Sequence, residues 1–322
     1  MKAMVFTKYG SPDGLRLMEV EKPTPKAGEV LVKVVATAVN QADNHVLSGS
    51  LRFSTGLLKP KHPILGSDIA GVVETVGDNV TQFRPGDAVF GDLSGQGRGG
   101  FAEYVAAPET AVAPKPANLT FPQAAAVPMA AVTALQGLRD RGELRAGEQV
   151  LINGASGGVG TFAVQIAKVL GGEVTAVASS RKLKMVQAIG ADHVVDYTQE
   201  DFSRSGQQYD LIFDTVGNRS VAEYARALKP QGRFVTTAFL PGLLFRGWWP
   251  ANRARQKMVN LMAQPNKEDL LFLAEQLKTG RIMPVIDRCF PLAEAPAALR
   301  YLAKGHASGK VIIMMPDNSE RE

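Results

Sequence analysis

A glycine-rich turn is the part of this sequence best suited to hold a phosphorylated ligand. The segment LINGASGGVG, residues 151–160, places four glycines directly behind an apolar run. That run reads as a strand, and apolar residues at helical spacing follow the turn. Such a turn points the free N–H groups of a helix N-terminus at a pyrophosphate, and glycines permit a close approach. Read as the dinucleotide fingerprint, its three key positions fall on Ala155, Gly157 and Gly160, so alanine replaces the first glycine.

The residues behind the next strand indicate which dinucleotide is bound. An NAD site usually has an acid about 20 residues beyond the glycines, to hold the ribose 2′-hydroxyl. Residues 174–191 contain no Asp or Glu, and hydroxyl and cationic side chains cluster there instead. That cluster suits the 2′-phosphate of NADP(H), although a solvated basic turn is the alternative. The predicted cofactor contacts in these two segments are Ser156, Gly157, Gly158, Val159, Ser179, Ser180, Arg181, Lys182 and Lys184.

Side chains that could bind a metal are scarce. The single cysteine, Cys289, can form neither an internal disulfide nor the paired thiolates of a structural zinc site. None of the four histidines has a partner at metal-like spacing. We therefore predict that no metal is bound.

Two kinds of sequence pattern follow one another along the chain, and they predict the elements that position these residues. Up to about residue 120, short segments of alternating apolar residues lie between Gly and Pro turns, which favours a mostly antiparallel, barrel-like β domain. From residue 149, short apolar strands alternate with amphipathic helices, which favours parallel βαβ units in a doubly wound sheet. Residues 243–249 could form the last strand of that sheet. Two strand-like segments near the C-terminus could return to the first domain.

The fold class predicted is therefore α/β, with a Rossmann-type doubly wound parallel sheet inserted in a mostly β catalytic domain. The predicted division is 1–123 for the first part of the catalytic domain, 124–262 for the cofactor-binding domain and 263–322 for the return to the catalytic domain. At 322 residues the chain is long enough for two cores.

Composition excludes several classes of protein. The 36 basic and 31 acidic residues give a net charge of +5, but no basic stripe or recognition motif points to nucleic acid. The longest apolar run, residues 124–132, is interrupted by Pro128 and falls far short of the roughly 20 residues that span a membrane. The first residues lack the pattern of a secretory signal. We expect a soluble, cytoplasmic protein whose partner is a small molecule.

Several segments spread along the chain in order resemble the medium-chain dehydrogenase/reductase superfamily. They are AVNQADNHVLSG (38–49), HPILGSDIAGVVETVG (62–77), FRPGDAVFG (83–91), GGFAEYVA (99–106), GASGGVG (154–160) and HASGKVII (306–313). The resemblance implies a GroES-like catalytic domain around the inserted Rossmann domain, with the substrate cleft between the two.

The same resemblance separates zinc-dependent from metal-free members. Zinc members have Cys, His and Cys where this chain has Asn40, Ser67 and Met129, and the four-cysteine lobe of a structural zinc is also missing. The chain is therefore similar to the zinc-lacking branch of quinone oxidoreductases (zeta-crystallin-like) and enone reductases.

His45 and Asn40 are the candidate catalytic residues. The position of His45 corresponds to a proton-relay His in zinc alcohol dehydrogenases and to Tyr or Lys in metal-free members. His45 could protonate a developing enolate or bind the nicotinamide ribose, or it could merely line the cleft. Asn40 could donate to a substrate oxygen or brace its own loop. We expect Asp43 and Asp68 to brace the local backbone.

The resemblance also implies further cofactor contacts and an assembly. These contacts are Thr133, Tyr197, Val216, Phe239, Leu240, Gly309 and Lys310. The apolar segment 243–249, which includes Trp248 and Trp249, would form an exposed sheet edge through which family members dimerise. Residue pattern and resemblance together predict an NADPH-dependent reductase of quinones or α,β-unsaturated carbonyls that works without metal. The alternatives are an NADPH-binding sensor or structural protein with little turnover, and an alcohol dehydrogenase.

Overall fold

The computed structural model describes residues 1–240, 243 and 255–316, which divide into two compact units. Unit 1 comprises Met1–Met129, Pro265–Gly280 and Pro284–Glu322, and unit 2 comprises Ala130–Gln264 and Arg281–Met283. Helix α4 (Pro128–Leu135) contains the first boundary. The domain limits expected from the sequence stay a prediction.

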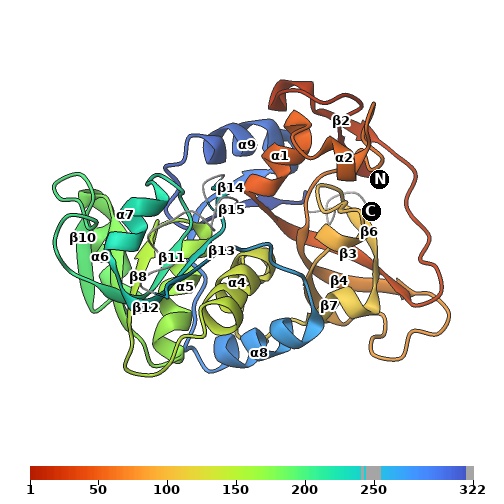
Figure 1. The fold of residues 1–322 in the computed structure, drawn as a ribbon. Coiled ribbons are helices and arrows are strands. Elements are labelled where there is room, and N and C mark those ends of the chain that lie inside the picture. The colour runs from red at the N-terminus through yellow and green to blue at the C-terminus, as the bar shows by residue number, and fades with distance from the viewer. Residues whose placement is uncertain (241–242, 244–254, 317–322) are drawn as a thin grey trace. The chain divides into compact units, whose positions relative to one another are not determined.

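Unit 1 is built on a seven-stranded sheet in which β14, β15, β3, β4, β5 and β7 are neighbours in that order and β6 also pairs with β3 (Figure 1). Every pair is antiparallel except β14 with β15. The strands of unit 1 are β1 (Lys2–Val5), β2 (Arg16–Glu19), β3 (Glu29–Val39), β4 (Asp68–Val76), β5 (Ala88–Asp92), β6 (Tyr104–Pro108), β7 (Val112–Pro114), β14 (Ile286–Pro291) and β15 (Lys310–Met314). Its helices are α1 (Gln41–Ser48), α2 (Arg52–Thr55), α3 (Phe121–Ala125), α8 (Lys267–Lys278) and α9 (Ala295–Ala303), with 3-10 turns at Pro12–Gly14, Ser94–Gln96, Glu109–Ala111 and Leu292–Glu294.

The core of unit 1 follows from its apolar strands. Strand β3 has the sequence EVLVKVVATAV, and its leucine and its valines except Val35 are buried, while Lys33 is exposed. Val30, Val32 and Val34 of β3 belong to one cluster with apolar side chains of β4 and β5. Each Å² of apolar surface removed from water contributes about 25 cal/mol, and this burial is the main free-energy contribution that holds such a sheet together.

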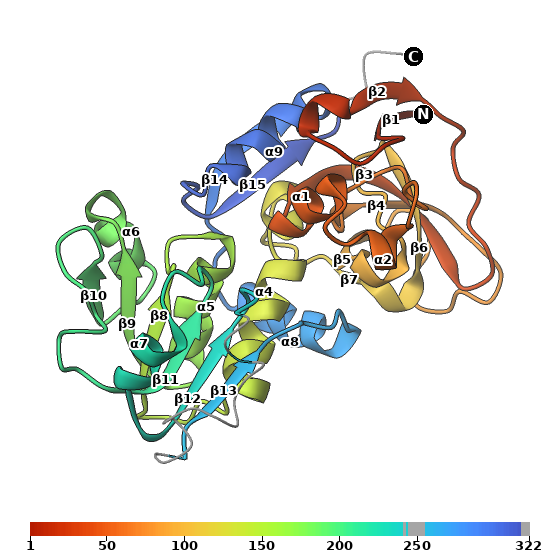
Figure 2. The same cartoon turned by 45° about the horizontal axis from the view of Figure 1, so that its top comes forward.

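Unit 2 is a six-stranded parallel sheet with the order β10, β9, β8, β11, β12, β13, which Figure 2 shows strand by strand. Its strands are β8 (Gln149–Asn153), β9 (Glu173–Ala178), β10 (His193–Asp196), β11 (Tyr209–Asp214), β12 (Leu228–Thr236) and β13 (Lys257–Asn260). Its helices are α5 (Gly158–Val169), α6 (Leu183–Ala188) and α7 (Val221–Arg226), with a π-helical turn at Gln136–Arg141 and a 3-10 turn at Ser180–Lys182. This strand order is that of a dinucleotide-binding Rossmann fold, so the predicted fold class is confirmed.

The edge of this sheet differs from the expectation. The sixth strand is β13, a four-residue segment of sequence KMVN that pairs with β12. Its short, mixed sequence carries no alternation long enough to predict a strand. The segment 243–249 lies outside the described residues except for Leu243, which is in a helical turn and packs in the core of unit 2.

Candidate functional site

The turn between β8 and α5 has the geometry of a pyrophosphate site. Gly157 caps α5 with an extended backbone, so the helix begins directly after it. A Cβ on Gly157 would meet only the Gly154 carbonyl oxygen, at 3.5 Å, so this position faces open space where a ligand fits. At Gly160, in contrast, a Cβ would lie 2.1 Å from the same oxygen. Gly157 therefore leaves room for a ligand, whereas Gly160 lets the helix pack on the turn.

The tight turn itself depends on Gly154. Its φ of +80° is the left-handed conformation that glycine adopts without strain, and a Cβ there would lie 2.4 Å from the Thr215 hydroxyl. The fingerprint expected from the sequence assigned its first position to Ala155, which is buried. In the structure Gly154 supplies the turn, so the substitution at Ala155 removes nothing from the site.

The basic cluster follows β9, as the sequence predicts, but an acid lies beside it. Ser180 and Arg181 are exposed in the 3-10 turn that follows β9. The Ser180 hydroxyl donates to the carboxylate of Asp196, at the end of β10. Hydrogen bonds from Ser180 and Thr198 lower the pKa of Asp196, which keeps it charged. Sequence reasoning missed Asp196 because strand pairing, and not sequence proximity, brings it next to Ser180.

Apolar side chains stand in solvent at the carboxyl ends of the strands. Tyr197 after β10, Val216 after β11 and Phe239 after β12 are 52%, 48% and 71% exposed. In parallel sheets, ligands bind at this edge, and exposed apolar side chains there are typical of surfaces that a ligand covers. Leu240 is half-buried, and Thr133 is a partly exposed position on α4. The roles of these five residues as cofactor contacts stay predictions.

A buried polar network braces the point where the strand order reverses. Asn153 at the end of β8 donates to Asp214 at the end of the neighbouring β11, with Nδ2 and Oδ1 2.8 Å apart. Asp214 also accepts the backbone N–H of Gly217 at 3.0 Å and the hydroxyl of Thr236 at 2.7 Å. These residues position the loop that carries Val216, and no motif in the sequence identified them.

In unit 1 a second network gathers Asn40, Asp68 and Lys310. The Lys310 ammonium lies 2.6 Å from Asn40 Oδ1 and 3.1 Å from Asp68 Oδ2. Asn40 Nδ2 donates to the same Asp68 oxygen at 2.9 Å, and the backbone N–H of Met129 donates to the other at 2.8 Å. Lys310 and Asp68 are only 3% and 0% exposed as side chains, so the ion pair is fully buried.

Sheet register brings these residues together. Val311 of β15 pairs with Val39 of β3, and Ala38 of β3 pairs with Asp68 of β4. Lys310 and Asn40 are each one residue from these pairs, so neighbouring strands end beside one another. The lysine that the resemblance implies as a cofactor contact thus has its ammonium engaged by Asn40 and Asp68. The adjacent Gly309, with φ +104°, is packed so that a Cβ would lie 2.3 Å from the Val285 carbonyl oxygen.

The positions of the zinc ligands converge on this network. Asn40 and Met129 contact Asp68 directly, and Ser67 precedes it with a buried hydroxyl that has no hydrogen-bond partner among the described residues. No group of three or more His, Cys, Asp or Glu that could hold a metal occurs in the described part of the chain. The ammonium of Lys310 belongs to the same network through Asn40 and Asp68.

Helix α1 carries Asp43, expected to brace the backbone, and the candidate catalytic residue His45. Asp43 accepts the backbone N–H of Asn40 at 2.8 Å and of Gly66 at 3.2 Å, so its expected bracing role is confirmed. Burial raises the pKa of Asp43 to about 6. Burial and the charge of Asp68 likewise raise the pKa of Asp92 to about 6. His45, two residues after Asp43, is exposed, and its ring has no hydrogen-bond partner within residues 1–240, 243 and 255–316.

Known protein families match both halves of the chain. Residues 26–117 match the family described as alcohol dehydrogenase GroES-like domain, and residues 189–313 match the family described as zinc-binding dehydrogenase. A chloroplast envelope quinone oxidoreductase homolog of Arabidopsis thaliana is 34% identical, and the match covers 97% of this chain and 98% of that protein. An NADPH-dependent alkenal/one oxidoreductase of the same plant is also 34% identical, with 97% and 79% covered. The solved structure of a quinone oxidoreductase from Coxiella burnetii superposes with a TM-score of 0.88 at 31% identity, covering 98% of this chain and 99% of that one.

Proposed function

The chain belongs to the medium-chain dehydrogenase/reductase superfamily, in its zinc-lacking quinone oxidoreductase and enone reductase branch, and from this premise we propose that it reduces quinones or α,β-unsaturated carbonyl compounds with NADPH. Relatives along nearly its whole length are named for these two activities. The observation that carries the proposal is the buried Lys310 ammonium, held by Asn40 and Asp68 beside the positions to which the resemblance assigns the ligands of zinc-dependent members.

The residues of unit 2 fit NADP(H). The open backbone at Gly157 and the N-terminus of α5 suit the pyrophosphate, and Arg181 and Lys184 carry positive charge where the 2′-phosphate is expected. Bound NADPH supplies the hydride, and the protein supplies orientation and electrostatics. Phe239 and Val216 offer apolar surface at the carboxyl edge for the nicotinamide end of the cofactor.

A site with an ammonium in place of zinc favours acceptors that need no strong Lewis acid. A lysine beside a carboxylate opposes entry of a divalent cation, because like charges at short range repel. In a quinone or an enone, hydride adds at carbon and the negative charge moves to an oxygen that hydrogen bonds can stabilise. We propose that the protein works without zinc for this reason.

His45 is proposed as the proton donor to the reduced acceptor. Its exposed ring, on helix α1 with Asn40 as the N-cap, has no competing partner in the described residues and is open to solvent. Asn40 acts as a positioning residue, since both ends of its amide are engaged by Asp68 and Lys310.

We also propose where the protein is located and how it assembles. Among the described residues, no helix is long and apolar enough to cross a membrane. A cytoplasmic location is proposed from the sequence, whereas the alkenal/one oxidoreductase relative is named chloroplastic. A homodimer through segment 243–249, which lies outside the described residues, is likewise a proposal.

The test is NADPH oxidation, followed by absorbance, with a panel of quinones, enals and enones. We expect turnover with NADPH above that with NADH, and no change after treatment with a chelator. The His45→Ala variant should lose activity while it retains NADPH affinity; full activity with every acceptor would remove His45 from the mechanism. Tight NADPH binding without turnover across the panel would favour the sensor alternative. One tightly held zinc per chain in an elemental assay would favour an alcohol dehydrogenase.

A further inference from the structure

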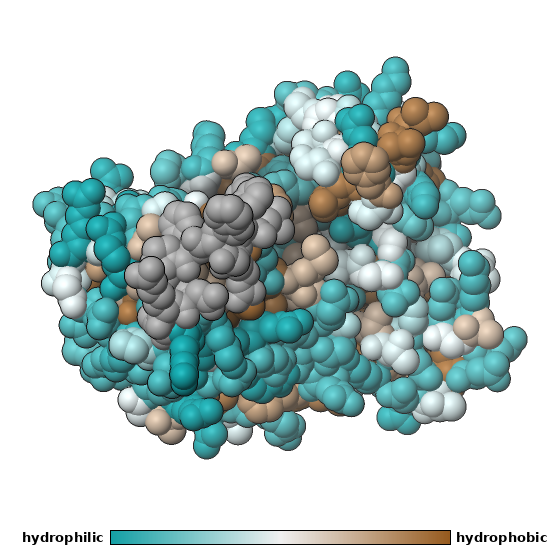
Figure 3. Space-filling model, in the orientation of Figure 1, coloured by the Kyte–Doolittle hydropathy of each residue, from teal (hydrophilic) through white to brown (hydrophobic). Residues whose placement is uncertain are grey.

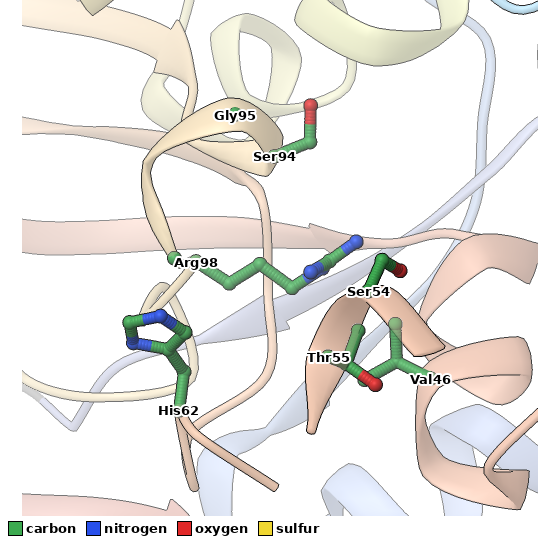
Figure 4. A pocket seen from close by; sticks show the side chains of 8 residues that line it. Val46, Ser54, Thr55, His62, Ser94, Gly95 and Arg98 are labelled. Atoms are coloured by element: carbon green, nitrogen blue, oxygen red, sulfur yellow. The ribbon is translucent and has the colours of Figure 1, made fainter. Parts of the chain in front are cut away.

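A small polar cavity in unit 1 is separate from the Asn40, Asp68 and Lys310 network. It encloses about 190 Å³ and is lined by Val46 of α1, Ser54 and Thr55 of α2, His62, and residues of the segment 94–98 (Figure 4). Pockets that hold whole drug-sized molecules measure about 300–1,000 Å³. This cavity is therefore sized for one chemical group of a larger ligand.

Arg98 is the charged side chain of this cavity. Figure 4 shows its guanidinium extending across the cavity toward Ser54, with His62 beside its stem. The Nε atom is buried and has no hydrogen-bond partner in the described residues, and no salt bridge joins the guanidinium to a carboxylate there. A guanidinium is always charged and donates through five N–H groups, so a buried Nε–H without an acceptor is costly.

The backbone at Arg98 adds a second cost. Its φ of +69° is a conformation that non-glycine residues rarely adopt. Such strain persists where the surroundings enforce it, often at ligand sites. Backbone strain and a buried, unpaired Nε–H at the same residue indicate a ligand that supplies the missing acceptor.

Several of the other polar groups around the cavity are already engaged. The hydroxyls of Ser54 and Thr55 both donate to the carbonyl oxygen of Leu51, at 2.9 and 3.0 Å. The backbone N–H of Ser94 donates to Asp92 Oδ1 at 2.7 Å. Asp43 feels the charge of Arg98, which lowers its pKa against the larger effect of burial, but its two oxygens are taken by backbone N–H groups. Arg98 is thus the charged residue of the cavity with a buried N–H that lacks an acceptor, and an anion is the acceptor that a guanidinium prefers.

A carboxylate is the anion that this geometry fits best. Its two oxygens match the planar fork of an arginine, and such charge-assisted pairs are about twice as strong as neutral hydrogen bonds. A carboxylate is also small enough for the cavity. Exposed apolar side chains adjoin Ser54 and Thr55 in the chain, namely Phe53, Leu57 and Leu58, at 91%, 59% and 93% exposure. Figure 3 shows apolar surface gathered over the part of unit 1 that contains β2 and α2.

We propose that this cavity is a carboxylate subsite for the electron acceptor, in which Arg98 pairs with an acid group attached to an apolar, α,β-unsaturated carbonyl skeleton. The inference rests on the proposed function, because it specifies the acceptor of that reaction. The NADPH hydride adds to the β-carbon, a proton adds to the α-carbon, and the acceptor leaves as the saturated carbonyl compound with its carboxylate unchanged.

The kinetic test compares 4-oxopent-2-enoate with its methyl ester, which share one enone and differ only in the charge. The variants are Arg98→Met, which removes the charge, and Arg98→Lys, which keeps it without the planar fork. Arg84→Met is the matched control, since the Arg84 side chain is 87% exposed. We expect Arg98→Met to raise KM for the acid by at least about tenfold, as the loss of a charge-assisted pair predicts, with the ester and the control unchanged. Arg98→Lys should lie in between.

Direct binding separates this inference from the proposed function. The saturated ketoacid 4-oxopentanoate is titrated into each variant in a calorimeter, which needs no turnover. If the wild type turns over neither acceptor but binds the ketoacid through Arg98, the reductase proposal fails and the subsite stands. Equal effects of Arg98→Met on acid and ester, or ketoacid binding unaffected by it, would overturn the subsite. Should Arg98→Met fail to fold, Arg98→Lys decides by the same comparison.

Discussion

Replacing Lys310 by methionine tests the buried network most directly. Methionine has a similar length and fits an apolar environment, so the change removes the charge with little change in packing. At 3.1 Å from Asp68, the ammonium contributes an attraction of about 5 kcal/mol at an effective dielectric constant of about 20. Much of this is offset by the cost of burying both charges in the native protein.

The variant leaves Asp68 buried with its two remaining donors, the backbone N–H of Met129 and the amide of Asn40. An uncompensated buried charge of this kind costs about 3–5 kcal/mol, so the free energy of unfolding should fall by that amount. The double variant Lys310→Met with Asp68→Asn removes both charges and should recover at least about 2 kcal/mol of the loss. Lys304→Met, at the exposed end of α9, is the control and should change little.

Urea denaturation followed by circular dichroism measures these free energies, and a titration with NADPH is run on the same samples. A coupling energy between Lys310 and Asp68 below about 0.5 kcal/mol would refute the reasoning, since independent sites behave that way. A stable Lys310→Met variant that had lost NADPH affinity would instead assign the ammonium to the cofactor.

Three further predictions concern the turn, the cofactor and pH. Gly157→Ala should fold normally but bind NADPH at least about tenfold more weakly. Gly160→Ala should lose about 1–3 kcal/mol or more of stability, because its Cβ would lie 2.1 Å from a carbonyl oxygen. Equal stabilities of the two variants in thermal unfolding would contradict this. Arg181→Ala should raise the Kd for NADPH and leave the Kd for NADH unchanged, as measured by cofactor fluorescence. An equal loss of affinity for NADPH and NADH would show that Arg181 does not bind the 2′-phosphate. The pKa of Asp43 is about 6 in the folded protein and about 3.8 in the unfolded chain. The stability that protonated Asp43 contributes is therefore full below pH 3.8 and is lost as the pH rises through 6. Relative to Asp43→Asn, the wild type should therefore lose about 3 kcal/mol between pH 4 and 7, and a flat difference in urea unfolding would show that Asp43 titrates normally.

The parts of the fold that follow from local pattern were predictable. The strand expected before the glycine turn and the next strand, before the basic cluster, occur as β8 (Gln149–Asn153) and β9 (Glu173–Ala178). Alternating strands and helices leave few parallel arrangements, so the Rossmann sheet follows from the order of its elements. Strand β13 was missed because four mixed residues show no period, and it forms through pairing with β12.

The sequence by itself determined the glycine turn, the basic residues after β9 and the loss of the zinc ligands, because each depends on residue type within a short segment. Tertiary structure alone decided which charges meet. Lys310 and Asp68 are 242 residues apart and become a buried ion pair through the register of β15, β3 and β4. Asp196 reaches Ser180 only because β10 lies beside β9. Arg98 is distinguished by the partners it lacks in the described residues, and whether a donor is satisfied depends on packing in three dimensions.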